Sequence, residues 1–154
     1  MTTVHTLASG SSGNAAVLSC GDTHLLIDAG ISCRRITAAL KEPGLTPADL
    51  TAILITHTHS DHISGLNTLL KKTTCPLLAT PWTCRELSCR VEGIDTRLMG
   101  LDSPITLGEI DMQPIPTSHD APGSCGWRLD TESGSVGFLT DTGYVTDEAL
   151  DLLP

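Results

Sequence analysis

The sequence predicts an α/β layered fold, in which helices pack against a sheet. Short apolar segments bounded by Gly, Pro and Asn turns alternate with segments whose apolar residues recur at helical spacing. The 154 residues are 40% hydrophobic but only 3% aromatic, and they include 14 Gly and 9 Pro. This composition is typical of a loop-rich α/β protein rather than a helical bundle. The length predicts one domain, residues 1–154, and no internal repeat or interdomain linker is visible.

The N-terminal part predicts strands with a helix between the third and the fourth. The strand segments are 4–8, 15–19, 24–28 and 51–56. Ser32 is a good N-cap for the helix, which should end before Pro43. Pro47 should then begin a single helical turn that leads into the fourth strand.

The rest of the chain predicts two further helices, a run of strands and a last helix. A helix should begin near Asp61 and continue to Leu70, with Lys71 and Lys72 in its last turn, because apolar residues from Ile63 onward recur at helical spacing. Pro81 suits the first turn of the next helix. The strand segments are 76–79, 105–107, 110–116, 126–129 and 136–140, and the last helix spans 147–153.

Charge and cysteine content limit the function classes. Acidic residues outnumber basic ones 18 to 9, which weighs against a broad basic surface for nucleic acid, although bound divalent cations would reverse the local charge. The six cysteines form no C-x-x-C pair, and the N-terminus has no secretory pattern. No apolar run approaches the ~20 residues of a membrane span. We therefore expect a cytoplasmic protein with reduced thiols and no membrane association.

The most informative segment is His57-Thr58-His59-Ser60-Asp61-His62, which follows the apolar run 52–56. Imidazoles together with a carboxylate are ligands that suit zinc and similar ions. His119 and Asp141 follow other predicted strands, and the ends of strands collect binding residues in α/β sheets. One metal needs only about three protein ligands. These side chains therefore predict a site for two metals with a shared water: His57, His59, Asp61, His62, His119 and Asp141.

The spacing His57-x-His59-x-Asp61-His62 resembles the H-x-H-x-D-H signature of metallo-β-lactamase fold hydrolases. Segments 8–14, 55–66, 80–83, 118–126 and 139–144 are similar to the YycJ/WalJ-like branch of that superfamily. The resemblance implies a metallo-β-lactamase αββα sandwich with two divalent metal ions, zinc being favoured over manganese. It also implies that His57, His59 and His119 hold one metal, that Asp61 and His62 hold the second, and that Asp141 bridges them.

The same resemblance implies a longer chain. In this family a further His after the bridging Asp completes the second metal site, whereas no His follows Asp141 here. We therefore expect that the C-terminal part of the sandwich is absent from residues 1–154. An inactive metal-binding fragment accordingly stays open as one interpretation.

The leading functional hypothesis is a phosphodiesterase of the nuclease type that uses a metal-bound hydroxide on a phosphodiester of DNA or RNA. Asp61 would be catalytic, orienting the nucleophile or relaying its proton. The alternative is another hydrolase of this fold, acting on a thioester, a lactone or a small cyclic phosphodiester; the acidic balance favours a small substrate. The Gly-Ser loop of the chain is expected to contact the substrate through Ser11, Ser12 and Asn14. A tight turn between strands would explain the same loop.

We also expect particular structural roles for three other residues. Asp28 ends a strand and should hydrogen-bond a metal ligand or a loop near the metals. Trp82 and Trp127 should be packed rather than stacked on bases, because the chain has few aromatic residues.

Overall fold

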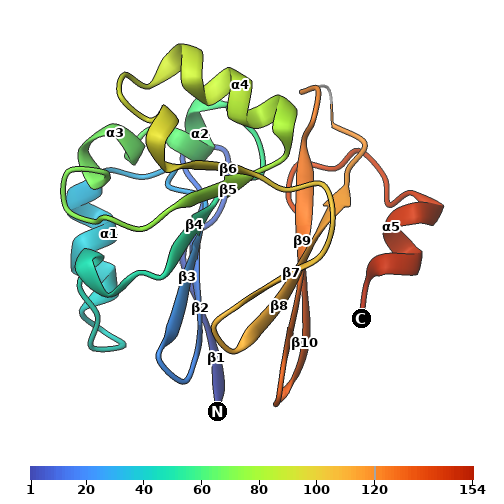
Figure 1. Cartoon of the computed structure of the whole chain (residues 1–154), viewed down its shortest axis with the longest axis horizontal. Helices are drawn as coiled ribbons and strands as arrows, with labels where there is room; N and C mark the ends of the chain where they lie inside the picture. Colours follow the sequence, from blue (N-terminus) through green and yellow to red (C-terminus); the bar gives the residue numbers. More distant parts are fainter. Residues whose placement is uncertain (120) are drawn as a thin grey trace.

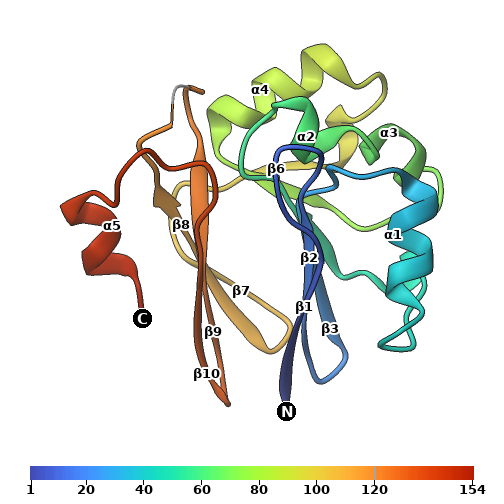
Figure 2. The same ribbon diagram turned by 180° about the vertical axis from the view of Figure 1, so that it is seen from behind.

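The computed structural model describes residues 1–119 and 121–154, which form two sheets packed face to face (Figure 1). Asp120, which belongs to the 118–126 segment, lies outside the described residues. Helices α1 to α4 cover the outer face of one sheet, and α5 lies against the other (Figures 1 and 2). The predicted αββα sandwich is therefore confirmed.

The first sheet has six strands in the order β1-β2-β3-β4-β5-β6. Its first three strands are antiparallel, and β3 to β6 are parallel. The bounds are β1 (Thr2–Ala8), β2 (Ala15–Cys20), β3 (Thr23–Ile27), β4 (Ala52–Leu54), β5 (Leu77–Ala79) and β6 (Leu98–Gly100). The carboxyl ends of the parallel strands therefore meet at one edge, which is where binding residues gather in such sheets.

The second sheet is an antiparallel meander in the order β10-β9-β8-β7. Its strands are β7 (Ile105–Leu107), β8 (Ile110–Pro116), β9 (Cys125–Thr131) and β10 (Gly134–Phe138). The helices are α1 (Cys33–Leu40), α2 (Ser60–Ile63), α3 (Leu66–Leu69), α4 (Pro81–Arg90) and α5 (Asp147–Leu152). In the described part of the chain, no helix is long and apolar enough to cross a membrane.

The inner strands β2 to β5 of the first sheet are buried on both faces, which explains their nearly continuous apolar sequences. Side chains such as Val17 and Leu26 pack under the helices, and their neighbours Leu18 and Leu25 pack against the second sheet. Trp127 is fully buried in that inner core, as expected. Trp82, in contrast, is 44% exposed, so the expectation that it is packed was wrong.

The predicted helix starts are confirmed by their caps. The Ser32 hydroxyl accepts a hydrogen bond from the Arg35 amide at the start of α1. The Thr80 hydroxyl does the same for Thr83 at the start of α4, where Pro81 is the first helical residue. Satisfying these otherwise unpaired amides stabilises a helix by about 1 kcal/mol per cap.

The helix expected from Asp61 to Leu70 is instead two short helices, α2 and α3. At the break, the Gly65 amide donates to the Ala29 carbonyl (2.8 Å) rather than to a helical partner. A Cβ at Gly65 would lie 1.9 Å from the Ile31 carbonyl oxygen, so only glycine allows this approach. Contact with the loop after β3 thus overrides the helical pattern, and Lys71 lies beyond α3.

Two smaller differences concern strands. The strand expected over 51–56 is shorter, because β4 covers only Ala52–Leu54 before the chain turns into the His-rich loop. The short strand β6 and the 3-10 turn Asp95–Arg97 before it were not predicted as separate elements. Three residues are too few to show an alternating pattern.

Candidate metal centre

Loops at one end of the sandwich bring the six predicted ligands together. His57 and His59 follow β4, and Asp61 and His62 lie in the first turn of α2. The other two come from the second sheet: His119 lies after β8 and Asp141 after β10. Segments far apart in the sequence therefore converge on one site.

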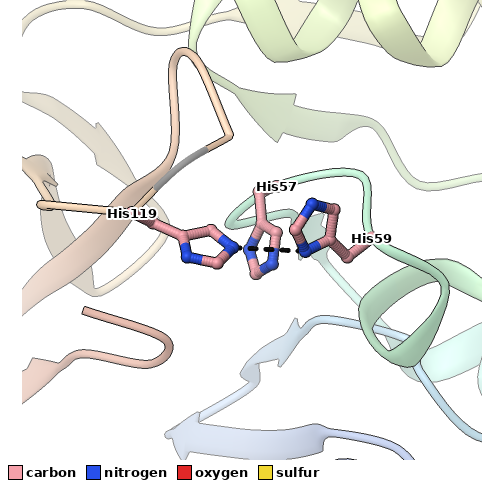
Figure 3. A group of neighbouring side chains, drawn as sticks. All are labelled: His57, His59 and His119. Carbon is pink, nitrogen blue, oxygen red and sulfur yellow. Dashed lines mark hydrogen bonds between the residues drawn. The ribbon is translucent and has the colours of Figure 1, made fainter. Parts of the chain in front are cut away.

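One group of possible metal ligands consists of three histidines, His57, His59 and His119. Figure 3 shows their rings converging from the β4 and β8 loops. The His59 Nδ1 and His119 Nε2 atoms are 3.2 Å apart, and the ligand atoms of each group all lie within 4.8 Å of one another. Three imidazoles at this separation could hold a zinc-like ion.

The second group contains His57 again, together with Asp61, His62 and Asp141. The Asp141 Oδ2 atom lies 2.6 Å from His62 Nε2 and 3.3 Å from His57 Nε2. Asp61 Oδ2 lies 3.5 Å from the same His62 nitrogen. The Asp141 carboxylate oxygen thus lies between the imidazoles of His57 and His62, and His57 is the residue that the two groups share.

The electrostatics of His57 fit a metal ligand. Its side chain is 1% exposed, and within the described residues its Nε2 atom has no hydrogen-bond partner. A buried nitrogen left in this state is costly unless something else occupies its lone pair. Burial, aided by the nearby His62, His119 and His59, lowers the pKa of His57 to about 3. The ring is therefore neutral at pH 7, which is the form that binds metals.

Asp28 and Thr56 orient two of the imidazoles. Asp28 Oδ2 lies 2.6 Å from His62 Nδ1 and also accepts the Thr56 hydroxyl proton (2.8 Å). The Thr56 oxygen can then accept the proton on His57 Nδ1, 3.0 Å away. In the tautomers that use both Nδ1 atoms as donors, the Nε2 atoms of His57 and His62 face Asp141 and can bind a cation. The expected hydrogen bond from Asp28 to a neighbouring ligand is confirmed.

Burial and the hydrogen bond act in opposite directions on this pair. Burial raises the pKa of Asp28, although its bonds to His62 and Thr56 favour the carboxylate. Burial lowers the pKa of His62, but the carboxylates of Asp28, Asp61 and Asp141 together outweigh it, so the pKa is raised overall. Sequence reasoning did not single out Thr56, although its position directly before the His motif was the available signal.

The Gly-Ser loop is hydrogen-bonded to the backbone of Asp61. The Asn14 amide donates to the Asp61 carbonyl (2.8 Å), and the Asn14 side chain donates to the Gly10 carbonyl (2.8 Å). A Cβ at Gly30 would lie 1.7 Å from the same Asp61 carbonyl oxygen, so this contact requires glycine. The loop is thus a turn that holds Asp61. Asn14 is partly buried within it, whereas Ser11 and Ser12 are exposed, and their substrate contacts stay a prediction.

A cavity of 240 Å³ adjoins His59. Its other lining residues are Thr58, Trp82, Glu86, Arg90, Ala121 and Pro122. Sequence reasoning missed this cavity. The spacing of Trp82, Glu86 and Arg90 could have indicated it, because residues four positions apart share one face of a helix.

Comparison with known proteins identifies a family that matches most of the chain. The family described as "Beta-lactamase superfamily domain" matches residues 23–154. Exodeoxyribonuclease WalJ of Streptococcus pneumoniae is 41% identical over 146 residues, which are 92% of this chain and 54% of that protein. Exodeoxyribonuclease YycJ of Bacillus anthracis is 34% identical over 144 residues, with the same two coverages. The chain therefore spans about half the length of these curated relatives.

Solved structures show the same fold at low sequence identity. A diphosphatase of the PhnP family superposes with a TM-score of 0.78 at 22% identity, over 98% of this chain and 70% of that one. A metallo-β-lactamase from Cronobacter sakazakii gives a TM-score of 0.75 at 18% identity, over 87% of this chain and 54% of that one. The likeness to these structures concerns the fold alone.

Proposed function

The chain belongs to the β-lactamase superfamily, and from this membership we propose that it is a metal-dependent phosphodiesterase of the nuclease type. The observation that carries the proposal is the pair of ligand groups that share His57, with the Asp141 oxygen between His57 and His62. The proposed substrate is a phosphodiester of DNA or RNA, and the proposed location is the cytoplasm. Zinc is the proposed metal, with manganese as the alternative, because imidazole and carboxylate ligands suit both.

The residues divide between two metals. His57, His59 and His119 would hold one ion, Asp61 and His62 would hold the second, and Asp141 would contact both. When bound, a pair of divalent ions lowers the pKa of a coordinated water and stabilises the charge that develops on phosphate oxygens. The buried Nε2 of His57, which has no hydrogen-bond partner among the described residues, supports this assignment, since a cation would occupy its lone pair.

Asp61 is the proposed proton acceptor. Its side chain is 25% exposed, so a water can reach it, while its main chain is held by Asn14. The Asn14 Nδ2 atom also lies 3.4 Å from Asp61 Oδ2. A carboxylate held in this way can orient the attacking water and accept its proton. Asp28, in turn, favours the His62 tautomer in which Nδ1 carries the proton, while Nε2 faces Asp141.

The distribution of charge supports a polyanionic substrate despite the formal charge of −9. Every Lys and Arg except Arg128 lies between Arg34 and Arg97, in the part of the chain that holds α1 to α4. Arg128 is itself paired with Asp130 (3.0 Å). The net negative charge therefore belongs mainly to the second sheet and α5. The names of the two exodeoxyribonuclease relatives point to the same substrate class.

Metal analysis tests the first part of the proposal. The purified chain should contain at least one zinc or manganese per molecule, and His57→Ala should lower that content. His5→Ala is the matched control, because His5 lies on β1 and belongs to neither ligand group. Metal content that is the same in both variants would refute the assignment.

Hydrolysis tests the second part. Bis-p-nitrophenyl phosphate should be cleaved in preference to a thioester or a β-lactam, and His57→Ala should abolish the cleavage. Preferential cleavage of the thioester would replace the phosphodiesterase proposal with the alternative of another hydrolase of this fold. Metal binding without any hydrolysis would favour the inactive fragment.

A further inference from the structure

We propose that the 240 Å³ cavity beside His59, here named the Trp82 pocket, binds one nucleobase next to the scissile phosphodiester, stacked on the Trp82 indole. This inference rests on the proposed function and names the part of the substrate that the site would recognise. The residues of the pocket are Thr58, His59, Trp82, Glu86, Arg90, Ala121 and Pro122.

The first support is the indole itself. Trp82 is 44% exposed in a chain with very few aromatic residues, whereas the other tryptophan, Trp127, is fully buried. The Arg85 guanidinium lies over the Trp82 ring, 5.4 Å from its centroid, and steadies it by a cation–π contact. A steadied, accessible indole is the kind of platform on which bases stack without sequence preference.

The second support is the polar wall on the same face of α4. Arg90 donates to the Thr58 carbonyl (3.2 Å) and to the Glu86 carboxylate (3.3 Å), so its direction is fixed. Its side chain is still 52% exposed, which leaves guanidinium N–H groups for a phosphate. The Glu86 carboxylate can accept from an amino group on a base edge. Stacking surface, cation and acceptor are the groups that recognise a nucleotide.

The third support is the place of the pocket between the loops that carry the first ligand group. Thr58 is the residue between His57 and His59, while Ala121 and Pro122 follow His119. That second wall is attached to the start of α4, because the Gly123 carbonyl accepts from the Thr80 hydroxyl (2.7 Å). A base in the pocket would therefore lie next to a phosphate held at the metal ligands.

The size of the pocket limits the occupant. Its 240 Å³ is below the ~300–1,000 Å³ of sites for drug-sized ligands, which suits one base with its sugar rather than an oligonucleotide. Arg90 also lines a second cavity of 580 Å³ together with Lys71. The sugar–phosphate backbone can thus continue past Arg90 toward further positive charge.

Binding of a hydrolysis-resistant, phosphorothioate-linked single-stranded DNA tests the inference. Fluorescence anisotropy on the metal-loaded chain would compare an ordinary strand with one of equal length that lacks its bases. Trp82→Ala should weaken binding of the ordinary strand about five- to hundredfold, the range for one stacked base. It should leave binding of the abasic strand unchanged. Trp82→Phe should retain most of the affinity, because phenylalanine still offers a ring.

The matched control is Val4→Ala, a similarly exposed apolar residue (48%) on β1, which should bind both strands like the wild type. Equal affinity of Trp82→Ala and wild type for the ordinary strand would overturn the inference, as would an equal loss on both strands. If Trp82→Ala does not fold, the test uses Trp82→Phe. A Trp82→Phe variant that binds the ordinary strand no better than the abasic strand would then overturn the inference. A wild type that binds metal and cleaves bis-p-nitrophenyl phosphate, but binds the ordinary and abasic strands equally, would refute only the proposed role of the pocket. A wild type without metal would refute the proposed function.

Discussion

The Nδ1 atom of His62 lies 2.6 Å from the Oδ2 atom of Asp28, and both side chains are fully buried. This contact joins the end of β3 to the first turn of α2 and leaves the other nitrogen of the ring, Nε2, facing Asp141. A carboxylate behind a histidine fixes the tautomer and raises the basicity of the ligating nitrogen. The geometry of the ligand groups therefore depends on a residue that would not contact the metal.

Asp28→Asn should weaken metal binding about 10- to 100-fold, the range for such supporting carboxylates. The two Asp28 oxygens accept from His62 and from the amide and hydroxyl of Thr56, so an amide NH₂ there would face donors. Competition with a chromogenic chelator measures the affinity. Asp22→Asn, in the exposed turn before β3, is the control and should bind as the wild type does. Equal losses in the two variants would contradict the role of Asp28.

Acid should destabilise the metal-free chain through His57. The pKa of this side chain is lowered from 6.5 to about 3 by burial and the neighbouring histidines. Between these values the unfolded state binds a proton that the folded state does not, so stability falls as the pH falls. The slope approaches about 1.4 kcal/mol per pH unit below pH 6, and the loss from pH 6.5 to pH 5 is about 1.7 kcal/mol.

Urea unfolding in the presence of a chelator measures this loss against His57→Gln, whose side chain does not titrate. The difference in unfolding free energy between wild type and variant should change with pH over this window. Parallel pH profiles for the two proteins would show that His57 is not kept neutral by its surroundings.

The cysteines should differ in reactivity toward iodoacetamide in the native state. Burial raises the pKa values of Cys75, Cys84 and Cys125, which lowers the fraction of reactive thiolate. Cys89 is exposed on α4. Mass spectrometry at pH 8 should therefore find the first adduct on Cys89, and denaturation should make the others reactive. Early labelling of Cys125 would be inconsistent with its burial between the sheets.

Gly30→Ala should destabilise the fold and disturb Asp61. The added methyl group would lie 1.7 Å from the Asp61 carbonyl oxygen, so the backbone must shift, at a cost of about 1–3 kcal/mol or more. Thermal unfolding and metal content should both fall. In Gly100→Ala the new methyl group meets Pro81 at an ordinary 3.6 Å, so this control should behave like the wild type. Unchanged metal content in Gly30→Ala would show that Asp61 tolerates the shift.

The candidate ligand side chains and most of the fold could be predicted from the sequence because their signals are local. His57 to His62 lie within one short segment, and the apolar strands before the ligands are continuous. Helix caps such as Ser32 act through residues only three positions away. The six ligand side chains named from the sequence are the same ones that the structure brings within reach of one another.

Only the tertiary structure decided how these residues are supported. The split between α2 and α3 follows from the contact of Gly65 with Ala29, and the orientation of His62 follows from Asp28. The pocket at Trp82 exists because the loop after β8 is attached to α4. Each of these features joins segments that are far apart in the sequence. No local pattern encodes such contacts, because they arise only when the chain is folded and distant backbone and side-chain groups satisfy one another.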